Sequence, residues 1–229
     1  MNIAVFGTGA VAQTVGPALQ SCGHDIVYGT RNPAETLSRT EAGAFGNPPF
    51  SAWMKNHPAA RLASFAEAAE HAELIVNATS GHGSLPALEL AGAERLDGKI
   101  LIDIANPLDF SQGFPPSLFV CNTDSLGEQL QRAFPALKVV KTLNTLTAML
   151  MVNPAALPGD HVIFMSGNDA DAKSRVSTLL QESFGWKAGN IIDMGDITTA
   201  RGTEMILPIW VRLYGSFQTP MFNFQIVRS

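Results

Sequence analysis

The stretch Met1-Asn2-Ile3-Ala4-Val5-Phe6-Gly7-Thr8-Gly9-Ala10-Val11-Ala12 decides the fold of this 229-residue chain. Residues 2–6 are apolar and partly β-branched, which predicts a buried parallel strand. Residues 10–19 are small and apolar, and they predict the helix that follows the glycine turn. A strand, a Gly-x-Gly turn and a helix with Ala12 in the third small position form the dinucleotide-binding fingerprint.

Each position of this turn has a physical task. Gly7 allows the tight turn, Gly9 lets backbone N–H groups approach a pyrophosphate, and Ala12 lets helix and strand pack closely. The start of the helix favours negative charge because its first N–H groups have no partner within the helix. We therefore expect the cofactor to contact the turn and the first helical residues, namely Gly7, Thr8, Gly9, Ala10 and Val11.

The second strand, expected at residues 25–29, ends in Thr30-Arg31-Asn32-Pro33. NAD-binding units place an Asp or Glu about 20 residues after the glycines to hold the ribose 2′-hydroxyl, but no acid stands at this strand end. A hydroxyl, a guanidinium and an amide suit a 2′-phosphate instead. Thr30, Arg31 and Asn32 therefore predict NADP as the cofactor; the alternative is an ordinary surface turn in which Asn32-Pro33 starts a helix.

The composition is typical of a soluble globular protein with one large or two modest domains. Hydrophobic residues make up 46% of the chain, charged residues 15%, and the net charge is −5. Without a basic run, nucleic acid is not an expected partner. The two cysteines form no motif, so we expect a reducing, cytoplasmic setting, and no apolar run is long enough to predict a membrane partner.

Strand and helix patterns alternate along the rest of the chain, which predicts a parallel sheet covered on both faces. Further strands are expected at 61–64, 73–78, 99–104 and 138–143, with helices at 33–42, 65–70, 85–94 and 124–133. Residues 43–60 contain two glycines and three prolines, and they predict a long loop or a short inserted helix. Ser64 and Glu67 have the spacing of a capping box for the helix at 65–70.

The pattern restarts after residue 150. Strands are expected at 161–167 and 191–194, helices at 170–183 and from about 198, and the alternation at 222–227 predicts a final strand. The fold class is thus α/β, a Rossmann-type doubly wound parallel sheet with a small C-terminal α/β domain. We place the NADP-binding domain at 1–150 and the small domain, which would close the acceptor cleft, at 151–229.

Ligands of open α/β sheets bind beyond the carboxyl ends of the strands, where this chain has uncharged polar residues. Thr79 and Ser80 are expected to contact the cofactor or simply to form a turn. Asn106, before Pro107, would bond the nicotinamide or its ribose, or else its own backbone. Asn144 lies where a substrate ring could dock.

No residue pattern predicts a catalytic acid–base pair or a metal site. The histidines lack ligand spacing, and His82 is expected to be an exposed loop residue rather than a catalytic acid. Asp103 lies inside its strand. Arg201 and Glu204 are one helical turn apart and predict an ion pair on that helix.

Three motifs together resemble the NADPH-dependent coenzyme F-420 reductases. They are Gly7-Thr8-Gly9 with Thr30-Arg31-Asn32-Pro33, then Lys141-Thr142-Leu143-Asn144-Thr145, and Gly195-Asp196 with Ala200-Arg201 and Glu204. The ferric reductase domain of membrane-bound metalloreductases looks similar in the same regions. Archaeal members of the family carry a His where Asn144 aligns, and this departure leaves room for a flavin or another acceptor.

The resemblance implies hydride transfer between NADPH and a deazaflavin (coenzyme F-420) or flavin-type ring. By position, Thr79, Asn106 and Pro107 would lie near the nicotinamide half, and Asn144 and Leu146 would face the second ring. The expected partner is this small-molecule ring acceptor, and a homodimer is compatible with the sequence. The alternatives are a dehydrogenase of a small hydroxy or imino acid, which the strands at 161–167 and 191–194 disfavour, and a non-catalytic NADP-binding sensor.

Overall fold

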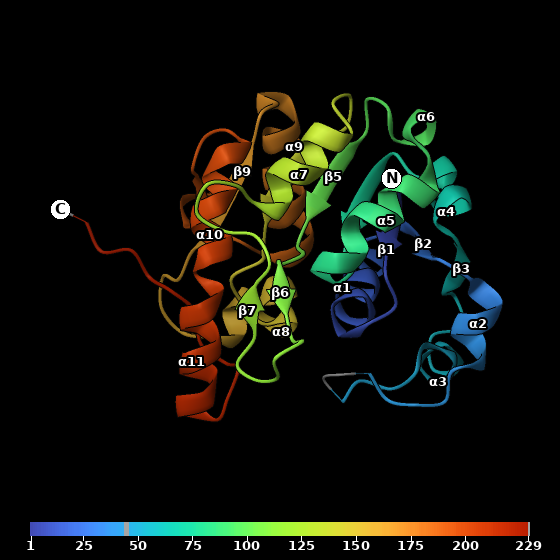
Figure 1. The fold of residues 1–229 in the computed structure, drawn as a ribbon, viewed down its shortest axis with the longest axis horizontal. Helices are drawn as coiled ribbons and strands as arrows, with labels where there is room; N and C mark the ends of the chain where they lie inside the picture. Colours follow the sequence, from blue (N-terminus) through green and yellow to red (C-terminus); the bar gives the residue numbers. More distant parts are fainter. Residues whose placement is uncertain (44–45, 229) are drawn as a thin grey trace.

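The computed structural model describes residues 1–43 and 46–228. Figure 1 shows helices on both sides of a twisted sheet. The strands are β1 (Asn2–Phe6), β2 (Asp25–Thr30), β3 (Arg61–Ser64), β4 (Leu74–Asn77), β5 (Ile100–Asp103), β6 (Leu108–Asp109), β7 (Ser117–Leu118), β8 (Lys138–Thr142), β9 (Ile163–Gly167) and β10 (Ile191–Asp193). The helices are α1 (Ala10–Ser21), α2 (Pro33–Ser38), α3 (Phe50–Lys55), α4 (Phe65–His71), α5 (Gly81–Ala91), α6 (Ala93–Leu96), α7 (Leu126–Ala133), α8 (Ala148–Val152), α9 (Ala170–Phe184), α10 (Ala200–Met205) and α11 (Leu207–Phe217), with short 3-10 turns η1 (Pro154–Ala156), η2 (Ala188–Asn190) and η3 (Ile197–Thr199).

The main sheet has the strand order β10-β9-β8-β5-β4-β1-β2-β3. Neighbouring strands run parallel from β3 through to β8, and β1 at the centre pairs with both β2 and β4. The chain order of these six strands is the doubly wound arrangement in which the direction of winding reverses beside β1. The Rossmann-type α/β fold predicted from the sequence is therefore confirmed.

Strand β1 is buried on both faces, which explains its continuous apolar sequence. Ile3 and Val5 belong to the core beneath α1, α8 and α9, whereas Ala4 and Phe6 belong to the core beneath α4, α5 and α7. The two cores fix the sheet in the middle layer of the molecule. This burial places the glycine turn that follows β1 at the carboxyl edge of the sheet.

The strands after residue 150 continue the same sheet. β9 lies antiparallel to β8, and β10 lies parallel to β9. The long helix expected from residue 198 is divided into η3, α10 and α11. The division into domains at 1–150 and 151–229 remains a prediction.

The strand expected at 222–227 is wrong. Within this segment, Phe224 accepts a backbone hydrogen bond from Val162 at 2.9 Å, but the segment forms no ladder. The ring of Phe222 instead packs against Trp210 and Phe217 of α11. Phe222 thus packs on a helix rather than in the sheet, and Figure 1 shows the chain then running away from the body of the molecule.

The segment 43–60 contains the short helix α3, which was one of the two structures predicted for it. Residues 44 and 45 of this segment lie outside the described residues. Phe50 and Trp53 of α3 pack against the buried ring of Tyr28 on β2. The helix expected at 33–42 ends earlier, at Ser38. The Ser64–Glu67 capping box is confirmed.

Gly16 marks the closest packing between α1 and the sheet. A methyl group added there would lie 1.9 Å from the Tyr28 hydroxyl oxygen, and Tyr28 is itself buried against α3. We predict that Gly16→Ala lowers the free energy of unfolding by about 1–3 kcal/mol or more, because the core cannot accept the added volume. Urea denaturation followed by circular dichroism measures this change.

Gly215 in α11 is the matched control. No atom lies within 4 Å of the position that a methyl group would take there. Gly215→Ala should therefore stabilise the protein by about 0.5–1 kcal/mol, the usual gain from replacing glycine within a helix. Equal effects of the two substitutions would contradict this view of the α1 packing.

Candidate functional site

The turn after β1 packs closely against the turn after β4 at Gly7 but leaves open space at Gly9. Gly7 has a φ of 112°, and a methyl group on it would lie 2.6 Å from the Ala78 carbonyl oxygen. Gly9, in contrast, has no atom within 4 Å of the position of a methyl group. Gly9 is the N-cap of α1 and supplies no side-chain cap, so the first N–H groups of this 12-residue helix are free to bind an anion.

Gln13, which the sequence reasoning missed, holds this turn in place. Its amide nitrogen donates to the Thr8 carbonyl oxygen and to the Pro48 carbonyl oxygen, both at 3.0 Å. The segment before α3 is thereby attached to the glycine turn. A polar residue within the apolar sequence of α1 was the signal available for finding it.

The three residues at the end of β2, Thr30, Arg31 and Asn32, differ in whether their side chains are already hydrogen-bonded within the protein. The Thr30 hydroxyl is buried and hydrogen-bonded to Thr36 at 2.8 Å, and Asn32 caps α2 by accepting from the Glu35 N–H at 3.2 Å. Arg31 is exposed and, within the part of the chain that the structure describes, its guanidinium makes no ion pair. Arg31 is therefore the group at this turn that is most available to a phosphate.

Thr79 and Ser80 connect β4 to the start of α5. The Thr79 hydroxyl donates to the Asn77 side-chain oxygen at 2.7 Å, which is the turn-forming role that the sequence left open. Ser80 is exposed and precedes α5 without capping it through its side chain. A methyl group on Gly81 would lie 2.2 Å from the Asn106 carbonyl oxygen, so this turn abuts the turn after β5.

Asn106 and Asn144, predicted separately, form a reciprocal pair. The Asn106 amide nitrogen donates to the Asn144 carbonyl oxygen at 2.8 Å, and the Asn144 amide nitrogen donates to the Asn106 side-chain oxygen at 2.9 Å. Asn144 also donates to the Thr203 carbonyl oxygen of α10 at 3.2 Å. This pair joins the ends of β5 and β8 to the C-terminal part of the chain.

The neighbours of this pair are buried or conformationally unusual. Pro107 is buried, and Leu146 lies in the core on the α1 side of the sheet. Leu143, directly before Asn144, has a φ of 60°, in the left-handed region that a branched apolar residue seldom adopts. The surrounding contacts therefore hold Asn144 in a turn that the local sequence alone would not favour.

A buried ion network lies directly behind the pair. The Lys141 ammonium contacts the carboxylates of Asp103 at 2.6 Å and Glu204 at 2.9 Å, and it donates to the Ala105 carbonyl oxygen at 2.6 Å. Asn77 donates to Asp103 at 2.8 Å. Burial opposes the charged form of Lys141, but the attraction of Asp103 and Glu204 outweighs it, so the pKa of Lys141 lies above its usual value.

The expected ion pair between Arg201 and Glu204 is wrong. Glu204 points inward, where it pairs with Lys141 and accepts from the N–H groups of Leu126 and Gly127 at the start of α7. Arg201 instead forms a two-pronged pair with Glu128 of α7 at 2.8 and 2.6 Å, and its hydrogen bond lowers the pKa of Glu128. Partners in the tertiary structure thus outcompete a neighbour on the same helix.

The remaining candidates lie outside this cluster. His82 is exposed, and its ring stacks on Phe119 with the centroids 4.2 Å apart. Among residues 1–43 and 46–228, no group of three His, Cys, Asp or Glu side chains could hold a metal ion. Within the same ranges, every helix is too short or too polar to cross a membrane.

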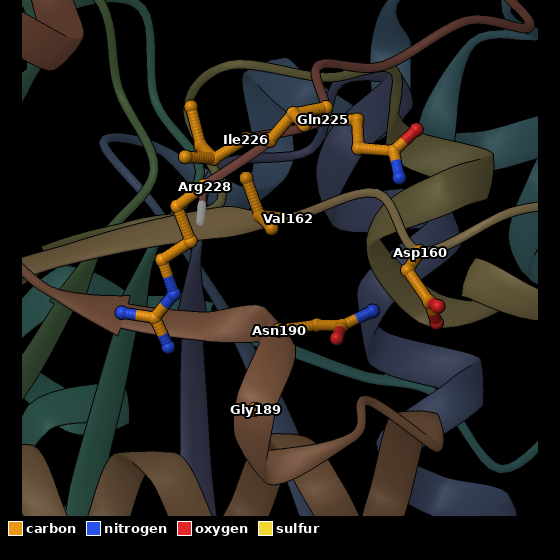
Figure 2. Close-up of a pocket in the computed structure, with 8 residues that line it drawn as sticks. Asp160, Val162, Gly189, Asn190, Gln225, Ile226 and Arg228 are labelled. Carbon is orange, nitrogen blue, oxygen red and sulfur yellow. The ribbon is translucent and has the colours of Figure 1, made fainter.

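An open cavity of about 430 Å³ lies between the starts of β9 and β10 and the C-terminal residues (Figure 2). Asp160, Asn190, Gln225 and Arg228 supply its polar lining. None of the binding residues expected from the sequence lines this cavity. The candidate site that we take from the sequence is the carboxyl edge between β1 and β8, which lies apart from this cavity.

Comparison with known proteins supports an oxidoreductase. The model of the family described as "NADP oxidoreductase, coenzyme F-420-dependent" matches residues 2–107. The crystal structure of a provisionally assigned F-420-dependent NADP reductase from Arthrobacter sp. FB24 is 56% identical, with each chain fully covered and a TM-score of 0.92.

Two more distant relatives match most of this chain, but the match covers a smaller share of each relative's own length. The metalloreductase STEAP3 of Rattus norvegicus is 29% identical over 91% of this chain, which spans 38% of that relative's length. A reductive aminase from Aspergillus terreus, solved with NADPH and ethyl levulinate, is 14% identical over 95% of this chain and 62% of its own, with a TM-score of 0.62. At that identity the aminase shows a shared fold alone.

The reciprocal amide pair predicts that substitutions of Asn144 destabilise the protein. Asn144→Ala should cost about 1–3 kcal/mol of unfolding free energy, because two acceptors, on Asn106 and Thr203, lose their donor. Asn144→Asp should cost more, since a carboxylate would place negative charge against those same oxygens. Urea denaturation at pH 7 measures both variants.

Asn56, exposed at the end of α3, is the control. Asn56→Asp should change the unfolding free energy by less than about 0.5 kcal/mol, as surface substitutions usually do. An Asn144→Asp variant as stable as the wild type would show that the pair does not form in solution.

Proposed function

We propose, from the premise that this chain belongs to the coenzyme F-420-dependent family of NADP oxidoreductases, that it transfers hydride between NADPH and a deazaflavin or flavin-type ring. The family rests on the full-length relationship to the Arthrobacter protein at 56% identity. The identity of the acceptor is our proposal. It is supported by the description of the Arthrobacter protein and of the family model, both of which name coenzyme F-420.

The cofactor NADP, given by the family, fits the turn after β1. Gly9 leaves room for a pyrophosphate at the open start of α1, and the close contact of Gly7 with Ala78 fixes the shape of the turn. We assign the pyrophosphate to Gly7, Thr8, Gly9, Ala10 and Val11. We assign the 2′-phosphate to the turn after β2, where Arg31 is the principal group and Thr30 and Asn32 support it.

The nicotinamide half is assigned to the neutral residues of the same edge. Bound NADPH supplies the hydride, and the task of the protein is to align two flat rings and exclude water. Thr79, Ser80, Asn106 and Pro107 would orient the nicotinamide, while Asn144 and Leu146 would face the acceptor. The observation that carries this assignment is the reciprocal Asn106–Asn144 pair, in which the partly exposed amide of Asn106 is held in a fixed orientation by the buried amide of Asn144.

The C-terminal part of the chain supports the same role. Thr203 of α10 accepts from Asn144, and this contact supports the proposal that residues 151–229 would close the acceptor side. The exposed free thiols of Cys22 and Cys121 suit a reducing, cytoplasmic setting. A dehydrogenase of small imino or hydroxy acids is less favoured, because β9 and β10 extend the sheet in this part of the chain.

Turnover with ring acceptors tests the proposal. Purified protein should oxidise NADPH, followed by its absorbance at 340 nm, when coenzyme F-420 or a free flavin is added. Small keto acids and cyclic imines serve as comparison substrates. Tight NADPH binding without turnover of any ring acceptor would favour the non-catalytic sensor, and turnover of the keto acids or imines alone would favour the dehydrogenase.

Arg31 should determine the preference for NADP. Arg31→Ala should weaken NADPH binding by about 1.5–3 kcal/mol, or roughly ten- to a hundredfold, because it removes charge-assisted hydrogen bonds to the 2′-phosphate. NADH, which lacks that phosphate, should bind almost unchanged. Fluorescence titration of both dinucleotides gives the two dissociation constants.

Arg61 provides the matched control. It is an exposed arginine at the start of β3 that pairs with Asp25, at the opposite end of the strands from the turn after β2. Arg61→Ala should leave the affinity for NADPH unchanged. Equal losses for NADPH and NADH in Arg31→Ala would show that Arg31 does not bind the 2′-phosphate.

A further inference from the structure

We infer that Lys141 is a positioning residue: with Asp103 and Glu204 it holds the Asn106–Asn144 pair in the orientation that the hydride transfer requires. The link between this orientation and hydride transfer rests on the proposed function. Its geometric basis is the buried network behind the pair, in which the Lys141 ammonium contacts three oxygens within 2.9 Å. Lys141 itself would touch neither cofactor nor acceptor, because its side chain is completely buried.

The first contact of Lys141 fixes the turn that carries Asn106. Lys141 donates to the Ala105 carbonyl oxygen, and Asp103 accepts from the Ala105 N–H at 3.2 Å. Both backbone polar groups of Ala105, the residue before Asn106, are therefore bonded to the lysine or to its carboxylate partner. Rotation of this turn would have to break charge-assisted hydrogen bonds in a site without water access.

The second contact fixes the helix that receives Asn144. Glu204 follows Thr203 directly, and the Thr203 carbonyl oxygen accepts from Asn144. Glu204 is itself held from two sides, by Lys141 and by the N–H groups at the start of α7. The lysine thus links the supports of both asparagines, one through β5 and one through α10.

The hydrogen-bonding pattern also explains why a lysine is needed here. Within residues 1–43 and 46–228, every hydrogen-bond partner of the Asp103 and Glu204 oxygens is a donor, so both carboxyl groups act as acceptors. An apolar residue of similar length at position 141 would leave two buried carboxylates facing each other without a cation. They would repel one another, and the two supports of the amide pair would move apart.

A variant of Arg201 can show whether Lys141 positions the asparagine pair or only attaches α10 to the rest of the protein. Its two-pronged pair with Glu128 joins α10 to α7, the same two helices that Glu204 joins. Arg201 does not contact the turn at Ala105 or the amide pair. Arg201→Gln should therefore loosen the attachment of α10 and lower the unfolding midpoint. It should leave the hydrogen bonds between Asn106 and Asn144 unchanged.

The experiment compares Lys141→Met with Arg201→Gln in the full chain. The side-chain amide signals of Asn106 and Asn144, assigned by their loss in the respective alanine variants, are recorded in ¹H–¹⁵N spectra. Steady-state kinetics with NADPH and the ring acceptor give kcat and KM. Glu204→Gln and Asp103→Asn, which keep the side-chain shape, serve in place of Lys141→Met should that variant not fold.

We expect Lys141→Met to shift both amide signals and to lower kcat at least about tenfold, since misplacement of reacting groups by about 1 Å is sufficient for such a loss. The KM for NADPH should change less than about threefold, because Arg31 and the glycine turn bind the distant half of the cofactor. Arg201→Gln should keep the amide signals and kcat of the wild type.

Two outcomes would overturn the inference: unchanged amide signals in Lys141→Met, or a loss of kcat no larger than in Arg201→Gln. Failure of the proposed function looks different. In that case the wild type transfers hydride to no ring acceptor, while the amide signals alone still decide whether Lys141 holds the pair.

Discussion

The buried ammonium of Lys141 is the interaction on which the arrangement of this site depends. A cation can lie in a protein interior only with carboxylates and carbonyl oxygens close around it. Here those oxygens come from β5 and the turn after it, and from α10, which lies about 100 residues further along the chain. The need to neutralise one lysine therefore helps to determine where α10 meets the Rossmann sheet, and the asparagine pair lies at that junction.

The separation of charged from neutral groups suits hydride transfer. The charged groups Asp103, Lys141 and Glu204 are buried, while the partly exposed groups nearer the edge, the amide of Asn106 and the hydroxyl of Thr79, are neutral, as is the buried amide of Asn144 between them and the network. In the proposed reaction hydride would pass between rings that take up charge themselves, so a side-chain acid or base at the edge would not be needed. A neutral surface on a rigid, charged support supplies alignment instead.

The sequence predicted those features that depend on neighbouring residues. The glycine turn, the capping box at Ser64 and the central strands follow from local sterics and from burial on two faces. Predictions failed where distant partners decide: Glu204 binds Lys141 rather than Arg201, and Phe222, in the segment 222–227 that does not join the sheet, packs on α11. The signal for the network was a lysine inside the apolar strand Val139-Val140-Lys141, but a single sequence does not show which carboxylates meet it.

Cofactor selectivity and catalysis should be separable in this architecture. Arg31 is an exposed group on a turn that Asn32 caps, and its removal disturbs no buried contact. The asparagine pair, in contrast, is part of a network that spans β5, β8 and α10, so any change there alters several supports at once. The end of the site to which we assign the 2′-phosphate can therefore vary independently, whereas the end to which we assign the two rings is constrained by its contacts with α10.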